Sequence, residues 1–142
     1  MRVTFDISKK DLNKLDNSLE AILTKIGKNT RKGTIEACRT ISEESLAQVP
    51  RDTETLAHSQ FWEVSGYYKT GWTAVIGYGG NGDPINPKNG LRASDYMLAV
   101  HEDLTQYHII GKAKFLEDPV RDYARERFPR TVFKYVQDAL NG

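Results

Sequence analysis

The apolar positions in the first third of the chain recur at helical spacing and predict a long N-terminal helical region. Ser8 is a favourable helix cap, and Asp11 lies three positions after it, close to a capping box. After this cap, apolar residues at steps of three and four form one stripe: Leu12, Leu15, Leu19, Ile22 and Ile26. Such a stripe is typical of an amphipathic helix. The alternating run from Arg2 to Asp6 predicts a short strand before it.

A second apolar set, out of phase with the first, follows at Ile35, Cys38, Ile41 and Val49. The step from Ile26 to Ile35 corresponds to about 900° at 100° per residue, which is half a turn out of phase. Either the chain breaks between Gly27 and Gly33, or one long helix offers two faces to two different neighbours. Asn29 and Thr30 are good caps for a restarted helix, so we favour a break or kink.

The middle of the chain alternates in the way of β-strands. Apolar side chains share one face in the run from Gln60 to Ser65 and again in the run from Gly71 to Tyr78, which predicts an antiparallel hairpin. Trp62 and Val64 share one face of the first run, and Trp72, Ala74, Ile76 and Tyr78 share one face of the second. Packing in the core is the ordinary role of such aromatics, and some could instead anchor an interface.

The second half of the chain alternates between loop signals and helix signals. Residues 79–94 are dense in Gly, Asn, Pro and Asp and predict a long loop, either flexible or ordered at an interface. The apolar run from Tyr96 to Val100 is too short to distinguish strand from helix. Asp118 followed by Pro119 predicts a capped helix start. The stripe of this C-terminal helix keeps its phase across Pro129, which predicts a kink: Val120, Ala124, Phe128, Val132, Tyr135 and Ala139.

These elements predict an α+β fold in one domain spanning residues 1–142. A small, mostly antiparallel sheet is packed by a long N-terminal helix region and a C-terminal helix. A length of 142 residues suits one domain. The net charge of +1 argues against a general attraction to nucleic acid. The single cysteine, Cys38, forms no intramolecular disulfide and is expected to be buried. We see no signal-peptide pattern and no run of the about 20 apolar residues that cross a bilayer, so we expect no membrane contact.

The stretch VPRDTETLAHS, residues 49–59, resembles a Val-Pro-x-Asp-Thr-Gly-x-Leu-x-x-Ser signature. This signature is typical of a family of tailed-bacteriophage structural proteins, the small minor capsid, neck and tail-completion (head–tail connector) proteins. Glu54 stands where the family usually has Gly. Because Glu tolerates a positive φ poorly, we expect a right-handed helical or extended backbone there. Thr53 is expected to cap a short turn through Leu56. The matching residues are Val49, Pro50, Asp52, Thr53, Leu56 and Ser59.

Two further motifs extend the resemblance toward the C-terminus. The family carries a Tyr-x-x-x-Val-His/Glu-Glu stretch and then, after a loop, an Ala, a Phe-Leu pair and a Pro before the last helix. The first stretch is matched here by Tyr96, Val100, His101 and Glu102, and the second by Ala113, Phe115, Leu116 and Pro119. The three motifs occur in the family's order between about Ser45 and Leu140.

The resemblance implies a non-enzymatic virion structural protein at the head–tail junction, assembled in the host bacterial cytoplasm. Such subunits form a homo-oligomeric ring, here expected to be sixfold or twelvefold, that joins the tail tube or its terminator to the head connector. DNA crosses the channel of the ring without sequence-specific binding. The resemblance implies no cofactor, metal or catalytic residue, and it makes the matched residues of the three motifs, apart from Ala113, the interface candidates.

A small metal-dependent hydrolase or nuclease is the alternative, built on His101, Glu102 and Asp103. These residue types are metal ligands and general bases. Adjacent side chains diverge, however, and the chain has neither a His-x-x-x-His pair nor a second Cys. The ordinary explanation is that His101 and Glu102 form hydrogen bonds at a sheet edge or an interface.

Overall fold

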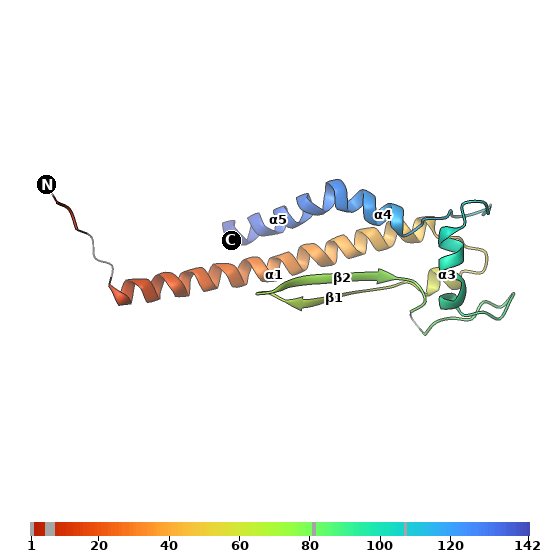
Figure 1. Ribbon diagram of the computed structural model, residues 1–142, viewed down its shortest axis with the longest axis horizontal. Helices are drawn as coiled ribbons and strands as arrows, with labels where there is room; N and C mark the ends of the chain where they lie inside the picture. Colours follow the sequence, from red (N-terminus) through yellow and green to blue (C-terminus); the bar gives the residue numbers. More distant parts are fainter. Residues whose placement is uncertain (1, 5–7, 81, 107) are drawn as a thin grey trace.

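One helix, α1 (Lys9–Gln48), runs the length of the molecule and organises the rest of it (Figure 1). The computed structural model describes residues 2–4, 8–80, 82–106 and 108–142. The later elements are α2 (Thr55–His58), β1 (Phe61–Tyr67), β2 (Gly71–Gly77), α3 (Ala93–Glu102), α4 (Glu117–Asp122), a π-helical turn η1 (Tyr123–Arg127) and α5 (Phe128–Asn141). The predicted α+β fold is confirmed: a long N-terminal helix, an antiparallel hairpin and a C-terminal helix.

The predicted break between Gly27 and Gly33 is wrong, because α1 is continuous over 40 residues. Both glycines are buried, and a neighbouring element approaches α1 closely at each of them. A Cβ on Gly27 would lie 2.6 Å from the Tyr68 Cβ, and one on Gly33 would lie 3.3 Å from the Tyr135 ring. The glycines therefore permit close packing rather than ending the helix.

The two residues expected to cap a restarted helix make other bonds. The Asn29 side-chain amide donates to the Tyr135 carbonyl at 3.1 Å, and the Thr30 hydroxyl donates to the Gly27 carbonyl at 2.8 Å. The expected cap at the start of α1 is confirmed, since the Asp11 N–H donates to the Ser8 hydroxyl at 3.1 Å. The second arrangement considered for this region, one helix with two faces, is the one that forms.

Those two faces pack on α5 and on the hairpin, which lie on opposite sides of α1 (Figure 1). In the hairpin, Trp62 pairs with Ile76 and Val64 with Ala74, so the residues predicted to share a face do so, although Trp62 and Ala74 are exposed. The Trp72 indole N–H donates to the Gly27 carbonyl at 2.8 Å. This bond fixes the tip of the hairpin against the middle of α1.

The C-terminal helix departs from its prediction at two places. Asp118 does not cap it: α4 already begins at Glu117, and the Asp118 carboxylate instead contacts Lys112 and Arg121. The π-helical turn before Pro129 adds a residue to one turn and shifts the phase of the helix. As a result Tyr123 enters the core, whereas Val120, Ala124 and Phe128 of the predicted stripe are exposed.

The later part of the predicted stripe is correct. Ala139 is buried, and Val132 and Tyr135 are half-buried against α1. The chain changes direction between α4 and α5, as expected from a kink near Pro129 (Figure 1).

Two segments predicted from composition and alternation carry no long regular element. Residues 2–4 of the predicted N-terminal strand have no regular structure, and residues 5–7 lie outside the described residues. The described part of the 79–94 loop holds one isolated bridge, between Ile85 and Arg92, before α3 begins. The Asp83 carboxylate accepts hydrogen bonds from the Ser94 N–H and hydroxyl at 2.9 and 2.6 Å, which joins the two ends of this loop.

Candidate functional site

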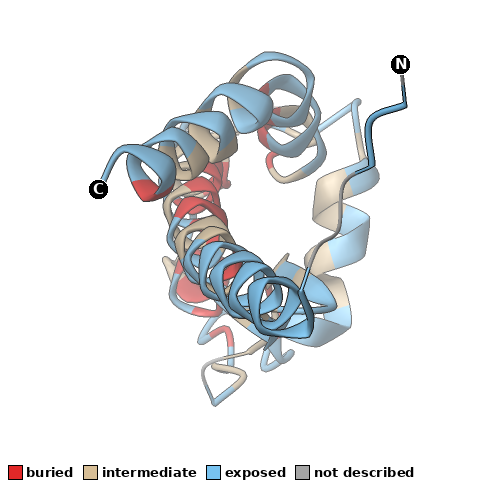
Figure 2. Cartoon of the chain, turned by 90° about the vertical axis from the view of Figure 1, so that its left-hand side faces the viewer, coloured by how far each residue is buried: buried red, intermediate tan, exposed pale blue. Residues whose placement is uncertain are grey.

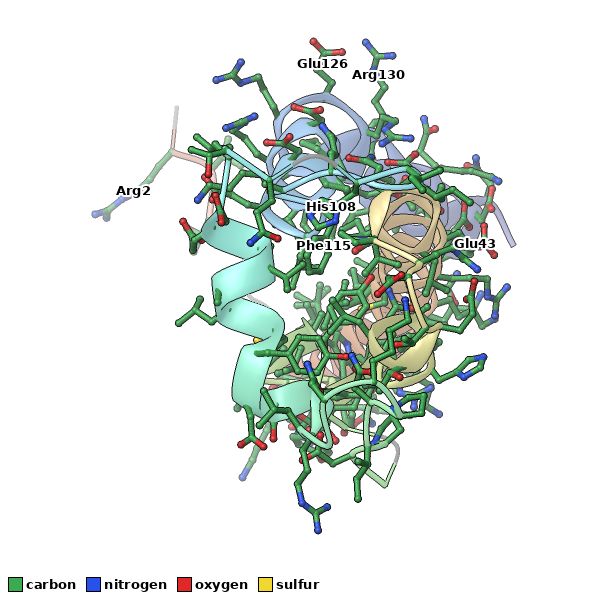
Figure 3. All side chains as sticks on the ribbon, turned by 90° about the vertical axis from the view of Figure 1, so that its right-hand side faces the viewer. Arg2, Glu43, His108, Phe115, Glu126 and Arg130 are labelled. Atoms are coloured by element: carbon green, nitrogen blue, oxygen red, sulfur yellow. The ribbon has the colours of Figure 1, made fainter. Side chains whose placement is uncertain are left out.

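The three sequence motifs meet at one end of the molecule, where α1 ends. We call this end the head: the last turn of α1, α2, α3 and residues 108–119. Its core contains Val49 and Leu56 from the first motif and Phe115 from the third, with Tyr96 and Val100 from the second packed against them. Figure 3 places Phe115 between α3 and the end of α1. Segments up to about seventy positions apart in sequence thus form one packed unit.

The first motif is held against the third by backbone contacts. The Arg51 N–H donates to the Ile110 carbonyl at 3.3 Å, and the Lys112 N–H donates to the Gln48 carbonyl at 2.9 Å. Between these bonds lies Gly111, with a φ of +99°, where a Cβ would stand 2.5 Å from the Pro50 nitrogen. Pro50 therefore ends α1 and also forms the surface on which residues 110–112 lie.

The backbone at Glu54 corrects a prediction. Its φ is +59° and its ψ is −6°, which is left-handed and not right-handed or extended as expected. The Glu54 side chain accepts from Arg51 at 3.0 Å, and Arg51 also donates to the Leu46 carbonyl at 3.0 Å. Thr53 is not a helix cap either, since α2 begins at Thr55 and the two threonine hydroxyls bond to each other at 2.8 Å.

Ser59 and Asp52 connect the first motif to the 79–94 loop. The buried Ser59 hydroxyl donates to the Leu56 carbonyl at 2.7 Å and accepts from the Gly79 N–H at 3.0 Å. The Asp52 carboxylate, which is exposed, forms an ion pair with Lys88 at 2.6 Å. One buried bond and one surface bond therefore hold the start and the middle of the loop against the first motif.

The second motif lies on α3, which resolves the ambiguity of its short apolar run in favour of a helix. His101 packs edge-to-face on Phe115, with ring centroids 5.0 Å apart and planes at 82°. Phe115 makes a similar contact with Tyr78, at 5.0 Å and 89°. The imidazole is thus part of the aromatic core of the head on one side and reaches polar groups on the other.

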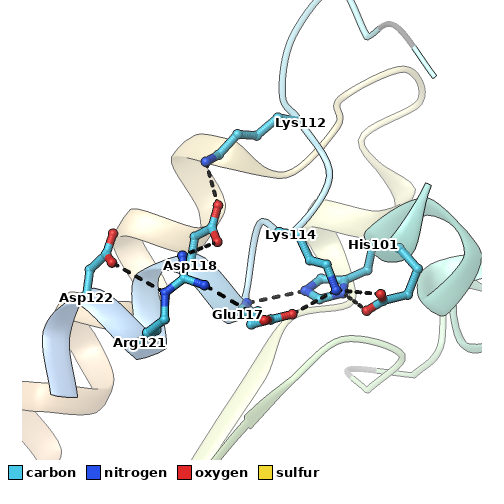
Figure 4. Close-up of polar contacts among 8 residues, drawn as sticks. His101, Lys112, Lys114, Glu117, Asp118, Arg121 and Asp122 are labelled. Atoms are coloured by element: carbon cyan, nitrogen blue, oxygen red, sulfur yellow. Dashed lines mark hydrogen bonds and ion pairs between the residues drawn. The ribbon is translucent and has the colours of Figure 1, made fainter. Parts of the chain in front are cut away.

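Those polar groups form a network around Lys114 (Figure 4). The Lys114 ammonium contacts Glu102 at 2.5 Å and Glu117 at 2.8 Å. His101 Nδ1 lies 2.8 Å from Glu102, and the Glu117 N–H donates to His101 Nε2 at 3.3 Å. Because Nε2 accepts, Nδ1 carries the proton and donates to Glu102. These contacts lower the pKa of Glu102, chiefly through Lys114 and then His101, and raise that of Lys114.

A cation site could be drawn from the same atoms, because ligand atoms of His101, Glu102 and Glu117 lie within 4.8 Å of one another. The place of a cation between the two carboxylates is taken by the Lys114 ammonium, and both imidazole nitrogens have hydrogen-bond partners. Asp103 does not join the group, since its carboxylate accepts from Thr105 at 2.6 and 2.9 Å. The arrangement holds both carboxylates on the Lys114 ammonium and fixes the start of α4 beside α3.

Sequence reasoning missed the exposed apolar residues beside the motifs. Of the thirteen motif residues proposed as interface candidates, Asp52 and Glu102 are exposed, and the rest are buried or half-buried. Large apolar side chains surround them on the surface: Leu98, Leu104, Ile109 and Ile110, of which Ile109 is 92% exposed. The apolar pair Ile109-Ile110 directly before a Gly was the signal in the sequence that could have identified this surface.

A buried polar network was also missed. The Tyr78 hydroxyl lies 2.7 Å from the Ser45 hydroxyl and accepts from the Gln60 amide at 2.9 Å. Gln60 also donates to the Ser42 carbonyl at 3.0 Å and bonds to the Ser42 hydroxyl. Burial raises the pKa of Tyr78. The alternating pattern placed Tyr78 on the same face as Trp72 and Ile76, but it carries no information about the partner of the hydroxyl.

No family model, curated protein or solved structure matches this chain. Among the described residues, no helix combines the length and the apolar content needed to cross a bilayer.

Proposed function

We propose that the chain is a virion structural protein of a tailed bacteriophage, acting at the head–tail junction as a ring-forming tail-completion or neck subunit. It joins the tail tube to the head connector around the channel that DNA crosses, and it is assembled in the host cytoplasm. The observation that carries this proposal is the meeting of the three family-like motifs in one packed head.

The packing of the three motifs in one head supports the proposal, because matches that arose by chance would not be expected to lie together. Val49, Leu56 and Phe115 share one core, and Ser59 bonds to the backbone of the following loop. The left-handed backbone at Glu54 is also the conformation that the family's usual Gly adopts without strain. Several matched positions thus have a local physical role of the kind that a shared fold requires.

The surface of the head also suits a subunit held among neighbours. Contiguous exposed apolar surface on a protein is typical of an interaction site. Leu98, Leu104 and the pair Ile109-Ile110 are large exposed apolar side chains at this end of the molecule, on α3 and on the segment after it. The side chains of His101, Glu102 and Glu117, by contrast, are paired with one another and with Lys114. A role in assembly therefore explains the exposed apolar side chains of the head better than a role in catalysis does.

The proposal is tested in the phage that encodes the chain. Deleting the gene is expected to leave DNA-filled heads and separate tails, and a plasmid copy is expected to restore joined particles. Electron microscopy of lysates gives the ratio of joined to separate particles, and labelled antibody on purified virions locates the chain. Normal virions without the gene, or complete virions that lack the chain, would contradict the proposal.

A further inference from the structure

The N-terminal half of α1 extends beyond the rest of the molecule with an uncovered apolar stripe (Figures 1 and 2). Its side chains at Leu12, Leu15, Leu19 and Ile22 are between 44% and 55% exposed, and the steps of three and four continue to Ile26. We call these five residues the stripe. A 3-4-3-4 repeat of apolar residues is the pattern with which one helix packs along another.

The stripe continues a face of α1 that is already in use. The next steps of three and four lead from Ile26 to Asn29 and Gly33, the two positions that contact α5 through Tyr135. Further along this face, Glu44 binds Arg127 with both carboxylate oxygens, at 2.5 and 2.6 Å. The helix–helix interface between α1 and α5 therefore ends where α5 ends, while the face of α1 that forms it continues for about four further turns.

The same molecule carries a groove that such a helix face would fit. It has a volume of about 620 Å³ and lies between α5 and the tip of the hairpin, with α1 at its base. Its lining is almost wholly apolar and includes Thr34, Trp72, Phe128, Val132, Phe133 and Val136. From Phe128 to Val136 the groove follows α5 for about 12 Å at 1.5 Å per residue, or roughly two helical turns.

We propose that the stripe of one copy docks in the groove of the next copy, so that the chains associate head-to-tail. A stripe and a groove at different places on one molecule make a heterologous contact, which generates rings when the rotation closes. Ile22 and Leu19 of the incoming helix would lie beside Phe133 of the receiving copy and continue the packing that α5 already makes with α1. That these contacts close into a ring is an inference that rests on the proposed function. The contact between two copies is inferred from the stripe and the groove alone.

The first test is the mass of the purified full chain in solution as a function of concentration, by sedimentation velocity. The wild type is expected to associate. The double variant Leu15→Glu/Leu19→Glu is expected to bind its neighbours about a hundredfold more weakly, since each change puts a charge into the contact. The matched control is Asn13→Glu/Asn17→Glu, which adds the same charge to the opposite face of the same helix and is expected to associate as the wild type does. Circular dichroism checks that all three keep their helix content.

The second test identifies the surface that receives the stripe. Leu19→Cys and Phe133→Cys are made in separate chains, mixed, and treated with a short bifunctional maleimide. Dimers are expected in the mixture and not with either variant alone, because the contact joins a stripe to a groove; the native Cys38 is buried. Cross-linking of Leu19→Cys with itself would show that stripes pair with stripes and would overturn the proposal.

The two proposals fail separately. A wild-type chain that stays monomeric at every concentration, or a stripe variant that associates normally, overturns the docking of the stripe but leaves a role at the head–tail junction open. If the chain associates through the stripe but is missing from complete virions, the docking of the stripe stands and the role at the head–tail junction is overturned.

Discussion

The two ends of α1 differ in what covers them. Around the head, Val49, Leu56 and Phe115 are buried by three segments from distant parts of the chain. At the other end, Leu15 and Leu19 have similar apolar side chains at regular helical spacing, yet they remain exposed. Both regions therefore carry large apolar side chains, but only those of the head are buried within the same chain. We infer that the residues of the head determine the fold of the monomer and that those of the stripe mediate its association with other copies.

The largest effect is expected from emptying the core of the head. Phe115→Ala removes a ring packed against Tyr78 and His101, and should lower the free energy of unfolding by about 3–5 kcal/mol. Urea unfolding followed by circular dichroism measures it. Leu98→Ala on α3 is the control, since Leu98 is exposed and its loss should cost less than about 0.5 kcal/mol. Equal effects would mean that Phe115 is not the centre of the core.

A second variant tests the contact between the first and third motifs. Gly111→Ala places a Cβ 2.5 Å from the Pro50 nitrogen at a φ of +99°, and should cost roughly 3 kcal/mol. Gly90→Ala is matched for positive φ, at +72°, but has nothing within 4 Å, so it should cost only about 1 kcal/mol. Thermal unfolding of the two variants separates packing from backbone strain. Equal losses of stability would contradict the close approach of residues 110–112 to Pro50.

The buried hydroxyl at the edge of the head core should have a smaller effect. Tyr78→Phe leaves Ser45 and Gln60 without a shared partner, and should lower the free energy of unfolding by about 1–3 kcal/mol. Urea unfolding checks the value. Tyr67→Phe at the exposed end of β1 is the control and should be near neutral. A neutral Tyr78→Phe would show that the hydroxyl is not held by these two residues.

The link between α1 and the turn η1, which precedes α5, should depend on pH. The hydrogen bonds from Arg127 lower the pKa of Glu44, so the pair contributes stability above the ordinary glutamate pKa of about 4.3. That contribution is lost as the pH falls through the lower folded-state pKa. Because both side chains are about two-fifths exposed, Glu44→Gln should cost only about 0.5–1 kcal/mol at pH 7 and nothing near pH 2. Urea titrations at the two pH values test this, and a cost that does not change with pH would contradict it.

The smallest effect on folding should come from the stripe itself. Leu19→Ala in dilute solution should change the free energy of unfolding of the monomer by less than about 0.5 kcal/mol, because this side chain is half-exposed and alanine favours a helix. Urea unfolding at low protein concentration is the measurement. A loss near that of Phe115→Ala would mean that the stripe packs within its own chain, and the contrast between the two ends would disappear.

Periodicity identified the elements of this fold but not their ends. The hairpin faces, the Ser8 cap and the burial of Cys38 follow from alternation, cap chemistry and residue type. The continuity of α1 through Gly27 could not be inferred, because a glycine that ends a helix and one that admits a neighbour look alike in sequence. Only the approach of Tyr68 distinguishes them.

Local propensity also failed where tertiary contacts decide the backbone. Asp118 has the chemistry of a cap, but Lys112 and Arg121 bind its carboxylate and α4 begins before it. Glu54 adopts a left-handed backbone conformation that residues with a side chain disfavour. In this conformation its carboxylate forms an ion pair with Arg51. The three motifs identified segments that the structure brings together in the head. The network of Lys114 with Glu102 and Glu117 depends on the tertiary fold, which the spacing of these residues in the sequence does not reveal.

Amide hydrogen exchange at low and high protein concentration tests most directly whether the chain keeps folding and assembly in separate regions. Exchange in the head should be slow and independent of concentration, because its bonds lie within one chain. Exchange in residues 9–26 should be fast when dilute and slow at high concentration, together with the groove around Phe133. Exchange in residues 9–26 that is the same at both concentrations would contradict the account, because the stripe would then have no partner among copies of this chain.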